Sequence, residues 1–162
     1  MAIVYFAKGS NEKISPHFRA REFDCPCSRC KETPIDVDLV RDVLEPIRVK
    51  EGKPMYVNGY RCPAHNAEVP NASKTSRHMN GDAFDVSFHD GNAIVIAKAA
   101  EKKSVKGIGY YKEEDFVHVD GRTVKSYWLG HEQAQTDTFL SEEEAKCAKL
   151  IVEIETVIAK YK

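Results

Sequence analysis

The stretch T-S-R-H-M-N-G-D-A-F-D-V, residues 75–86, decides the fold and points to the chemistry. It places His78 and Asp85 seven residues apart, with the histidine ahead of a glycine. Phe84 and Val86 alternate with Ala83 and Asp85, which is the period-two pattern of a half-buried strand. Asp85 is therefore expected on the sheet face opposite the phenylalanine, in a cleft.

A second cluster, D-F-V-H-V-D at residues 115–120, supplies another histidine inside a strand-like alternation. Imidazole and carboxylate are good zinc donors at neutral pH, and three protein ligands leave one position open for water. His78, Asp85 and His118 are therefore the candidate ligands of one catalytic zinc ion. Taken singly each residue is a weak signal, because an isolated histidine in an apolar strand is more often buried and hydrogen-bonded.

Composition bounds the class of protein. The 162 residues fit one domain that can bury a core without disulfides or metals. A formal net charge of −1 gives no basic excess of the kind that a general nucleic-acid binder carries. No apolar run approaches the length of a membrane span. We therefore expect no nucleic-acid partner, no membrane insertion and a monomer.

The N-terminal run of residues 3–7 is apolar but lacks a preceding basic segment, so it is expected to be a first strand rather than a signal peptide. Five cysteines are an odd number, and reduced thiols are the expectation for a cytoplasmic product. Cys25, Cys27, Cys30 and Cys62 could form a four-thiolate zinc site. Their spacing is not that of paired Cys-x-x-Cys ribbons, so a loop with small apolar cysteines is favoured.

The pattern of elements predicts one α+β domain, with an antiparallel sheet carrying the zinc site on one face and helices on the other. Helices are expected at 36–50, capped by Asp36 and bent at Pro46, at 63–69, and at 92–103, capped by Asp90. Further strands are expected at 55–60, 84–88, 106–111, 116–120 and 124–129, the last three as an antiparallel meander.

The tail from Ser141 is predicted to be a long helix that starts with a Ser141–Glu144 capping box. Its apolar stripe is expected to pack against the domain, in preference to dimerising or docking on a partner. The chain is thus divided into a domain that carries the candidate zinc ligands, 1–135, and a C-terminal helical extension, 136–162.

Peptide hydrolysis needs a general base and a group that stabilises developing negative charge. Asp115, three residues before His118, is the favoured base. Glu114 and Asp120 are less favoured, and Asp120 could instead orient a ligand. Arg61 is the candidate for the oxyanion and Arg77 a weaker one. Ser76 could shape the turn or bind substrate, and the other histidines (His17, His65, His89 and His131) are expected to have structural or surface roles.

Three ordered motifs carry a resemblance: G-Y-R-C-P-A-H-N at 59–66, S-R-H-M-N-G-D-A-F-D at 76–85, and G-I-G-Y-Y followed by F-V-H-V-D at 107–120. Together they resemble the zinc D-Ala-D-Ala carboxypeptidase-like peptidases, which share a fold with the hedgehog signalling domain. The resemblance extends over residues 15–128. It implies His78, Asp85 and His118 as zinc ligands, Asp115 as acid/base, and Arg61 as the group that holds substrate or stabilises the oxyanion.

The resemblance implies a zinc metallopeptidase that hydrolyses stem or cross-bridge bonds of peptidoglycan, as a carboxypeptidase or endopeptidase. Without a signal peptide it is expected to be made in the cytoplasm and to act on the cell wall after release, as an endolysin of phage origin would. The alternatives are a non-catalytic zinc-stabilised binding module and a phage structural component. Asp115 and Arg61 together favour the enzyme.

Overall fold

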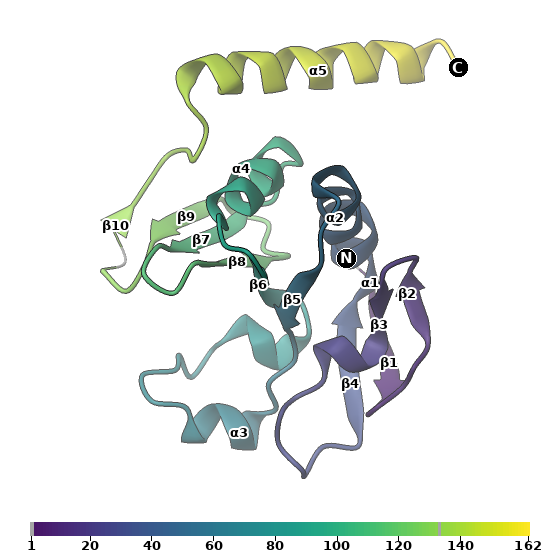
Figure 1. The fold of residues 1–162 in the computed structure, drawn as a ribbon, viewed down its shortest axis with the longest axis vertical. Helices are drawn as coiled ribbons and strands as arrows, with labels where there is room; N and C mark the ends of the chain where they lie inside the picture. Colours follow the sequence, from purple (N-terminus) through teal and green to yellow (C-terminus); the bar gives the residue numbers. More distant parts are fainter. Residues whose placement is uncertain (1, 133) are drawn as a thin grey trace.

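A six-stranded sheet is the centre of the computed structural model, which describes residues 2–132 and 134–162 (Figure 1). The strands lie in the order β10-β9-β7-β8-β6-β5. Their bounds are Met55–Asn58 (β5), Ala83–Phe88 (β6), Gly107–Tyr111 (β7), Phe116–Asp120 (β8), Ser126–Leu129 (β9) and Ala134–Gln135 (β10). The predicted α+β class is confirmed, and strands are present at the five predicted places from β5 to β9, whereas β10 was not predicted.

The sheet is mixed rather than purely antiparallel. β7 and β8 pair antiparallel, as do β6 and β8, but β9 runs parallel to β7. The predicted meander is therefore wrong at its third strand. Both edges of β8 are already occupied, by β7 and by β6, so the chain passes beyond β8 and adds β9 at the free edge of β7.

The N-terminal third forms two small antiparallel pairs beside this sheet. β1 (Ile3–Ala7) pairs with β4 (Glu32–Asp36), and β2 (Lys13–Ser15) pairs with β3 (Phe18–Arg19), followed by a 3-10 turn at Ala20–Phe23. β1 confirms the predicted first strand. β4 was not predicted, because it contains Pro34; proline is tolerated here because each strand of a two-stranded pair has a free edge.

The helical segment at 37–51 begins as predicted, with the Asp36 carboxylate accepting a hydrogen bond from the Leu39 amide at 3.2 Å. It consists of α1 (Val37–Leu39), a π-helical turn (Val40–Leu44) and α2 (Glu45–Glu51). Pro46 lies in the first turn of α2. Proline cannot donate to the preceding turn and its ring crowds the carbonyl four residues back, which accounts for the widened turn ahead of it.

The core lies between the sheet and the helices α2 and α4 (Ile94–Lys102). Phe84 and Val86 of β6, with Val117 and Val119 of β8, are fully buried on this side. Because strand side chains alternate, the residues between them project from the opposite face of the sheet. That face is turned towards α3 (Pro63–Glu68) and the segment that joins α3 to β6 (Figure 1).

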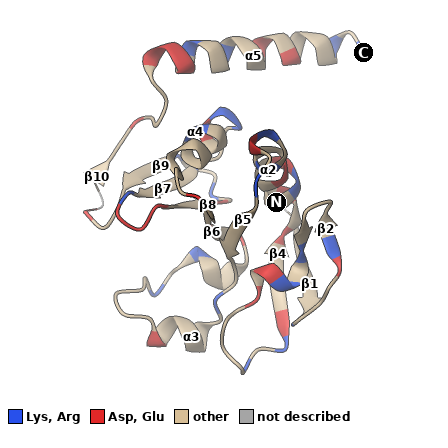
Figure 2. Ribbon diagram, viewed as in Figure 1, with Lys and Arg blue, Asp and Glu red and all other residues tan. Residues whose placement is uncertain are grey.

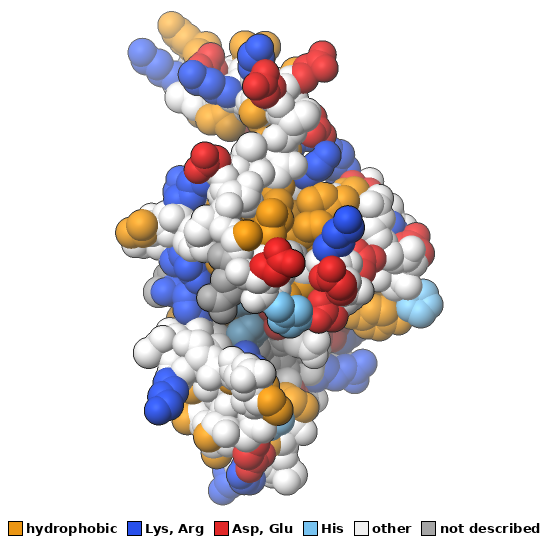
Figure 3. All heavy atoms as spheres, turned by 90° about the vertical axis from the view of Figure 1, so that its left-hand side faces the viewer, with side chains coloured by type: hydrophobic (Ala, Val, Ile, Leu, Met, Phe, Trp, Pro, Cys, Tyr) orange, Lys and Arg blue, Asp and Glu red, His pale blue; other side chains and the backbone are white. Residues whose placement is uncertain are grey.

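α5 (Glu142–Lys160) starts with the predicted Ser141–Glu144 capping box, but its apolar stripe does not pack on the domain. No residue of α5 is buried, and Leu150, Ile151, Val152, Ile154, Val157, Ile158 and Tyr161 are exposed. The helix stands off the body of the molecule (Figures 1 and 3). A Lys98–Glu144 ion pair of 3.2 Å holds its first turn to α4, and a cavity of about 570 Å³ lies among α2, α4 and α5. The prediction that the apolar stripe of α5 packs against the domain is therefore wrong. The helix is anchored through its first turn, and the stripe beyond that turn stays exposed.

Charged residues of both signs are interspersed over the fold (Figure 2). In α5 acidic residues occupy the first turn and Lys160 the last, the order that complements the helix dipole. Within the described ranges, no helix combines the length and the apolar character that crossing a bilayer requires.

Candidate active site

A single row of residues across four strands builds the floor of the site. Asp85 of β6 lies directly opposite His118 of β8, His118 opposite Gly109 of β7, and Gly109 beside Trp128 of β9. Directly opposite residues project from the same face of a sheet. The register thus brings Asp85 and His118 together although 33 positions separate them in the chain.

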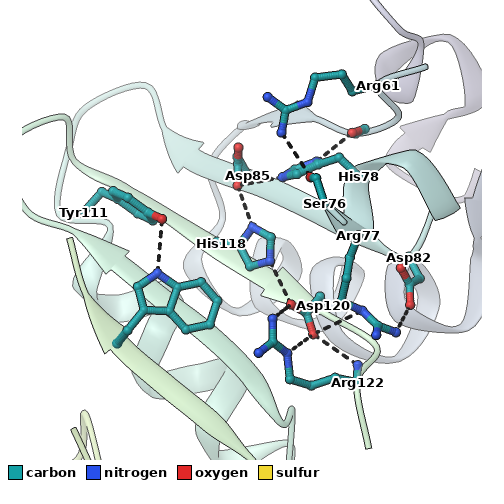
Figure 4. Close-up of polar contacts among 12 residues, drawn as sticks. Arg61, Ser76, Arg77, His78, Asp82, Asp85, Tyr111, His118, Asp120 and Arg122 are labelled. Atoms are coloured by element: carbon teal, nitrogen blue, oxygen red, sulfur yellow. Dashed lines mark hydrogen bonds and ion pairs between the residues drawn. The ribbon is translucent and has the colours of Figure 1, made fainter. Parts of the chain in front are cut away.

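His78 reaches the same point from a 3-10 turn, Arg77–Asn80, ahead of β6. Gly81 ends this turn with φ +80°, and a Cβ there would lie 2.4 Å from the Pro34 carbonyl oxygen, so only glycine fits. The Nδ1 of His78 lies 2.8 Å from the Gly59 carbonyl oxygen, to which it can only donate. Nε2 then faces Asp85, whose Oδ1 is 3.3 Å away (Figure 4).

His118 is oriented by a buried carboxylate in the opposite sense. Its Nε2 donates to Asp120 Oδ2 at 2.8 Å, which leaves Nδ1 directed at Asp85 Oδ1, 3.0 Å away (Figure 4). Asp120 is itself held by the Arg122 guanidinium at 2.8 and 2.7 Å. Two roles were predicted for Asp120, a less favoured general base or a residue that orients a ligand. Its hydrogen bond to His118 fits the second role.

The three convergent atoms fit a divalent metal ion. The two histidines and Asp85 offer ligand atoms that all lie within 4.8 Å of one another. Tetrahedral zinc with nitrogen and oxygen ligands at about 2.05 Å separates them by about 3.3 Å, close to the 3.0 and 3.3 Å found here. Each imidazole also carries the outer hydrogen bond that fixes the tautomer of a metal-binding histidine. The structure thus brings all three predicted ligands together.

The electrostatics around these atoms are strongly coupled. Burial raises the pKa of Asp85, but hydrogen bonds from His118 and His78 outweigh it and hold that pKa well below its usual range. Burial lowers the pKa of His118, but its hydrogen bonds to Asp120 and Asp85 raise it to about 9. In the metal-free protein His118 is therefore a cation between two carboxylates at neutral pH.

A proton must leave when a metal ion binds. Because the pKa of metal-free His118 is about 9, the imidazolium present at pH 7 has to lose one proton to expose Nδ1 as a ligand. For the zinc ion that binds at His78, Asp85 and His118 we expect release of about one proton at pH 7, with an apparent affinity that rises roughly tenfold per pH unit and levels off above pH 9. Calorimetric titrations in buffers of different ionisation enthalpy measure this count; a value near zero at pH 7 would contradict it.

Asp120 offers a test of ligand orientation. Asp120→Asn keeps an oxygen that can accept from His118 but removes the charge, and it weakens the link to Arg122. We expect activity at saturating zinc to fall by about 10–100-fold, the usual cost of losing such a partner. Hydrolysis rates of the variant and the parent, with zinc content measured on the same samples, check this. Unchanged activity would mean that Asp120 does not orient His118.

A cleft of about 790 Å³ opens above the three ligands. Arg61 lines it, and its Nη2 lies 3.4 Å from the Ser76 Oγ. The Arg61 Nε is buried and has no hydrogen-bond partner among the described residues. An unpartnered buried donor beside a cleft is free to bind an anionic or carbonyl oxygen of a ligand. The structure therefore places both Arg61 and Ser76 on the wall of the cleft.

Asp115 is not brought to this cleft. It is the last residue of the turn before β8 and has φ +55°, and its two carboxylate oxygens accept from the amides of Asn92 and Ala93, each at 2.8 Å. It thereby caps the chain ahead of α4, the role predicted for Asp90, which instead pairs with Lys53 at 2.8 Å. The assignment of Asp115 as catalytic base is therefore corrected: its carboxylate is aimed at α4 and away from His118.

Replacing Asp115 tests this correction. Asp115→Ala removes both hydrogen bonds to the chain ahead of α4 and should cost about 0.5–2 kcal/mol of unfolding free energy. Activity at a temperature where the variant is folded should be unchanged. Asp115→Asn, which keeps one acceptor and tolerates positive φ, is the matched control with a smaller loss. Denaturant unfolding and hydrolysis rates measure the two effects; lost activity in a fully folded variant would return the base role to Asp115.

Sequence reasoning missed the aromatic and basic walls of the cleft. Trp128 lies over Gly109, where a Cβ would approach its indole to 2.2 Å, and its ring centroid is 5.2 Å from that of His118. The indole Nε1 donates to the Tyr111 hydroxyl at 3.1 Å. Arg122 lies 5.1 Å over the Trp128 ring. The signal was present in G-I-G-Y-Y, because glycines two apart on one strand leave room for large neighbours on that face.

The remaining predicted residues are placed as follows. Arg77 is engaged by the buried Asp82 and lies 3.7 Å from Asp120, so its charge is already neutralised. His17 pairs with Glu45, His89 with Tyr56, and His65 lies beside Glu68. His131 lines the cleft and is paired with Glu114.

Comparison with known sequences identifies the family. A profile described as peptidase M15 matches residues 16–120, which include all three candidate ligands. The chain belongs to the peptidase M15 family. The match covers Arg61 and Asp120 as well, and ends before Trp128 and α5.

One curated relative is the Haemophilus influenzae protein named "Probable peptidoglycan L,D-endopeptidase MepK". It is 33% identical to this peptidase M15 member over 76 residues, which are 44% of this chain and 40% of the relative. The chain thus matches less than half of the relative's length.

Proposed function

We propose that this M15 peptidase is a zinc metallopeptidase that hydrolyses peptide bonds in the stems or cross-bridges of peptidoglycan. The observation that carries the proposal is the convergence of His78, Asp85 and His118 at the floor of a cleft in a chain of a peptidase family. The substrate class is supported by the resemblance in the motifs and by the name of the Haemophilus relative.

The ligand roles follow from the hydrogen bonds. His78 would offer Nε2 and His118 would offer Nδ1, because the opposite nitrogen of each ring donates to Gly59 and Asp120 respectively. Asp85 would supply the carboxylate oxygen between them. A zinc ion held there polarises a substrate carbonyl and lowers the pKa of water. Asp120 and Arg122 keep the His118 ring oriented.

Arg61 is the residue proposed to meet negative charge on the substrate. Its guanidinium lines the cleft wall next to His78, and its Nε lacks a partner among the described residues. A fixed donor aimed at an oxygen that gains charge in the transition state stabilises that state more than the ground state. Ser76, at 3.4 Å from the guanidinium, positions Arg61 and can contact substrate.

The proton transfer requires a group other than Asp115. The titratable side chains that line the cleft outside the ligand set and the arginines are Tyr111 and His131, counting only described residues. His131 is paired with Glu114, and Tyr111 accepts from the Trp128 indole. These two side chains replace Asp115 as candidates for the acid/base role.

The walls of the cleft suit a peptide with free carboxylates, as peptidoglycan stems have. Tyr111, Phe116 and Trp128 provide apolar and aromatic surface, while Arg61 and Arg122 provide positive charge. The aromatic rings would cover apolar side chains such as the alanine methyl groups, and the arginines would bind carboxylates. Which bond of the stem or cross-bridge is cut depends on how these groups place the peptide.

We further propose that residues 1–135 form the peptidase unit and that residues 136–162 are an extension. The family match within 16–120 and the exposure of α5 support this division. The protein is proposed to act as a monomer on the cell wall after release from the cell, as a phage lysin or a bacterial remodelling enzyme would.

Digestion of purified sacculi tests the proposed function. The zinc-loaded chain should release peptides whose new amino and carboxyl ends identify the bond by mass spectrometry, and chelation should stop the release. A chain that binds zinc and sediments with sacculi but releases nothing would instead be a non-catalytic binding module. This alternative is worth testing, because Asp115 and Arg61 were the two residues that favoured an enzyme, and Asp115 does not reach the cleft.

A further inference from the structure

Four cysteines from two distant segments meet next to Arg61, which directly precedes Cys62 in the chain. Cys25, Cys27 and Cys30 lie between the 3-10 turn and β4, and Cys62 is the residue at the start of α3. Their four sulfur atoms all lie within 4.8 Å of one another. Cys25 and Cys62 are buried, and Cys27 and Cys30 are half-buried.

The sulfur separations are those of ligands around one ion. Cys27 Sγ lies 3.5 Å from that of Cys25, 3.1 Å from that of Cys30 and 3.6 Å from that of Cys62. A disulfide would need about 2.05 Å. Tetrahedral zinc with sulfur at about 2.3 Å places its ligands about 3.8 Å apart. The four atoms are thus too far apart to be bonded and too close together to enclose a multi-iron cluster.

Backbone amides are already directed at two of the sulfurs. The amide of Cys62 donates to Cys25 Sγ at 3.4 Å, and the amide of His65 donates to Cys62 Sγ at 3.3 Å. Amide donors stabilise thiolates, as outer hydrogen bonds stabilise the ligands of other metal sites. Cysteines acting only as apolar filler would be spread through the core, whereas these four point at a common centre.

We propose that Cys25, Cys27, Cys30 and Cys62 bind a second zinc ion, a closed structural site separate from the catalytic one. Four thiolates leave no open position, so this ion stabilises the fold and takes no part in hydrolysis. The spacing C-x-C-x-x-C with a distant fourth cysteine made a loop with small apolar cysteines the favoured interpretation of the sequence, because the fourth ligand arrives only when β5 and the following segment fold against the 3-10 turn.

The site secures the segment that carries two functional groups. The Tyr60 amide donates to the Phe23 carbonyl at 2.8 Å, and Gly59 packs against Phe23 so closely that a Cβ would lie 2.9 Å from it. Gly59 supplies the carbonyl that orients His78, and Arg61 directly precedes Cys62. The second zinc therefore fastens the 59–62 segment to the 24–30 loop.

Metal content of the unaltered chain is the first test. Protein exposed to zinc and then dialysed should hold two zinc ions per chain, and Asp85→Ala should hold one. With cobalt in place of zinc, both proteins should show the near-ultraviolet charge-transfer band of thiolate ligation. In the native zinc form one thiol, Cys147, should react with a thiol reagent, and five should react after denaturation with chelator. One zinc in the parent, no thiolate band, or five thiols that react in the native zinc form would overturn the proposal.

Variants separate the four cysteines from the fifth. Cys30→Ser should remove the thiolate-bound ion and leave the other in place, while Cys147→Ser, in exposed α5, is the matched control and should still bind two. Should Cys30→Ser fail to fold without metal, the counts in the parent and in Asp85→Ala still decide. A Cys30→Ser protein that keeps two zinc ions would refute the assignment.

Discussion

Asp85→Ala is expected to empty the proposed catalytic metal site and to lower peptide hydrolysis by at least about a thousandfold. Asp85 Oδ1 lies 3.0 Å from His118 Nδ1 and 3.3 Å from His78 Nε2, so it is the one atom that joins both imidazoles. Metal chemistry of this kind supplies a large part of the acceleration of about a millionfold or more that is typical of enzymes. Hydrolysis rates and zinc content measured on the same preparation check the result.

The matched control for Asp85→Ala is Asp120→Asn. Asp120 orients His118 but is not a proposed metal ligand. It should retain the ion and a measurable fraction of activity. The two variants together distinguish loss of a ligand from general damage to the sheet. Full activity in Asp85→Ala would show that the three-residue site is not where hydrolysis takes place.

Arg61→Ala should lower kcat by about 100–1,000-fold, the range seen when one donor to a developing oxyanion is removed. The zinc content should not change, because the Arg61 guanidinium contacts Ser76 and none of the three ligands. Arg61→Lys should recover part of the rate, since an ammonium restores the charge but not the planar set of donors. Steady-state kinetics on a defined peptide measure kcat and KM separately.

Arg21→Ala is a suitable control for these variants, because Arg21 is an exposed arginine in the 3-10 turn of the N-terminal third. Its kinetics should equal those of the parent. If Arg61→Ala raised KM and left kcat unchanged, Arg61 would bind substrate equally in the ground and transition states, and its proposed role at the oxyanion would be wrong.

The ligand set could be predicted from sequence because it depends on short-range patterns. Asp85 and His118 each sit in a period-two strand, and alternation alone assigns both to the face opposite the phenylalanine and valine side chains. The antiparallel register of β6 and β8 then makes them direct neighbours. His78 is near in sequence to Asp85 and needs only one tight turn, which Gly81 permits.

The features that were missed depend on contacts that sequence spacing does not encode. Asp115 lies three residues before His118, as the predicted base should. Its own backbone φ of +55°, however, directs its carboxylate to the chain ahead of α4. The four cysteines were named as a possible zinc site but not favoured, because sequence spacing does not show that Cys62 reaches the other three through the packing of Gly59 on Phe23. The amphipathic pattern of α5 predicts a helix correctly but does not say what the apolar stripe contacts.

Zinc located by anomalous scattering in crystals of the zinc-loaded chain tests the central claim most directly. We predict a peak about 2.0–2.2 Å from His78 Nε2, His118 Nδ1 and an Asp85 carboxylate oxygen. If protein that hydrolyses peptidoglycan gave crystals with no zinc peak beside these three side chains, the claim would be contradicted.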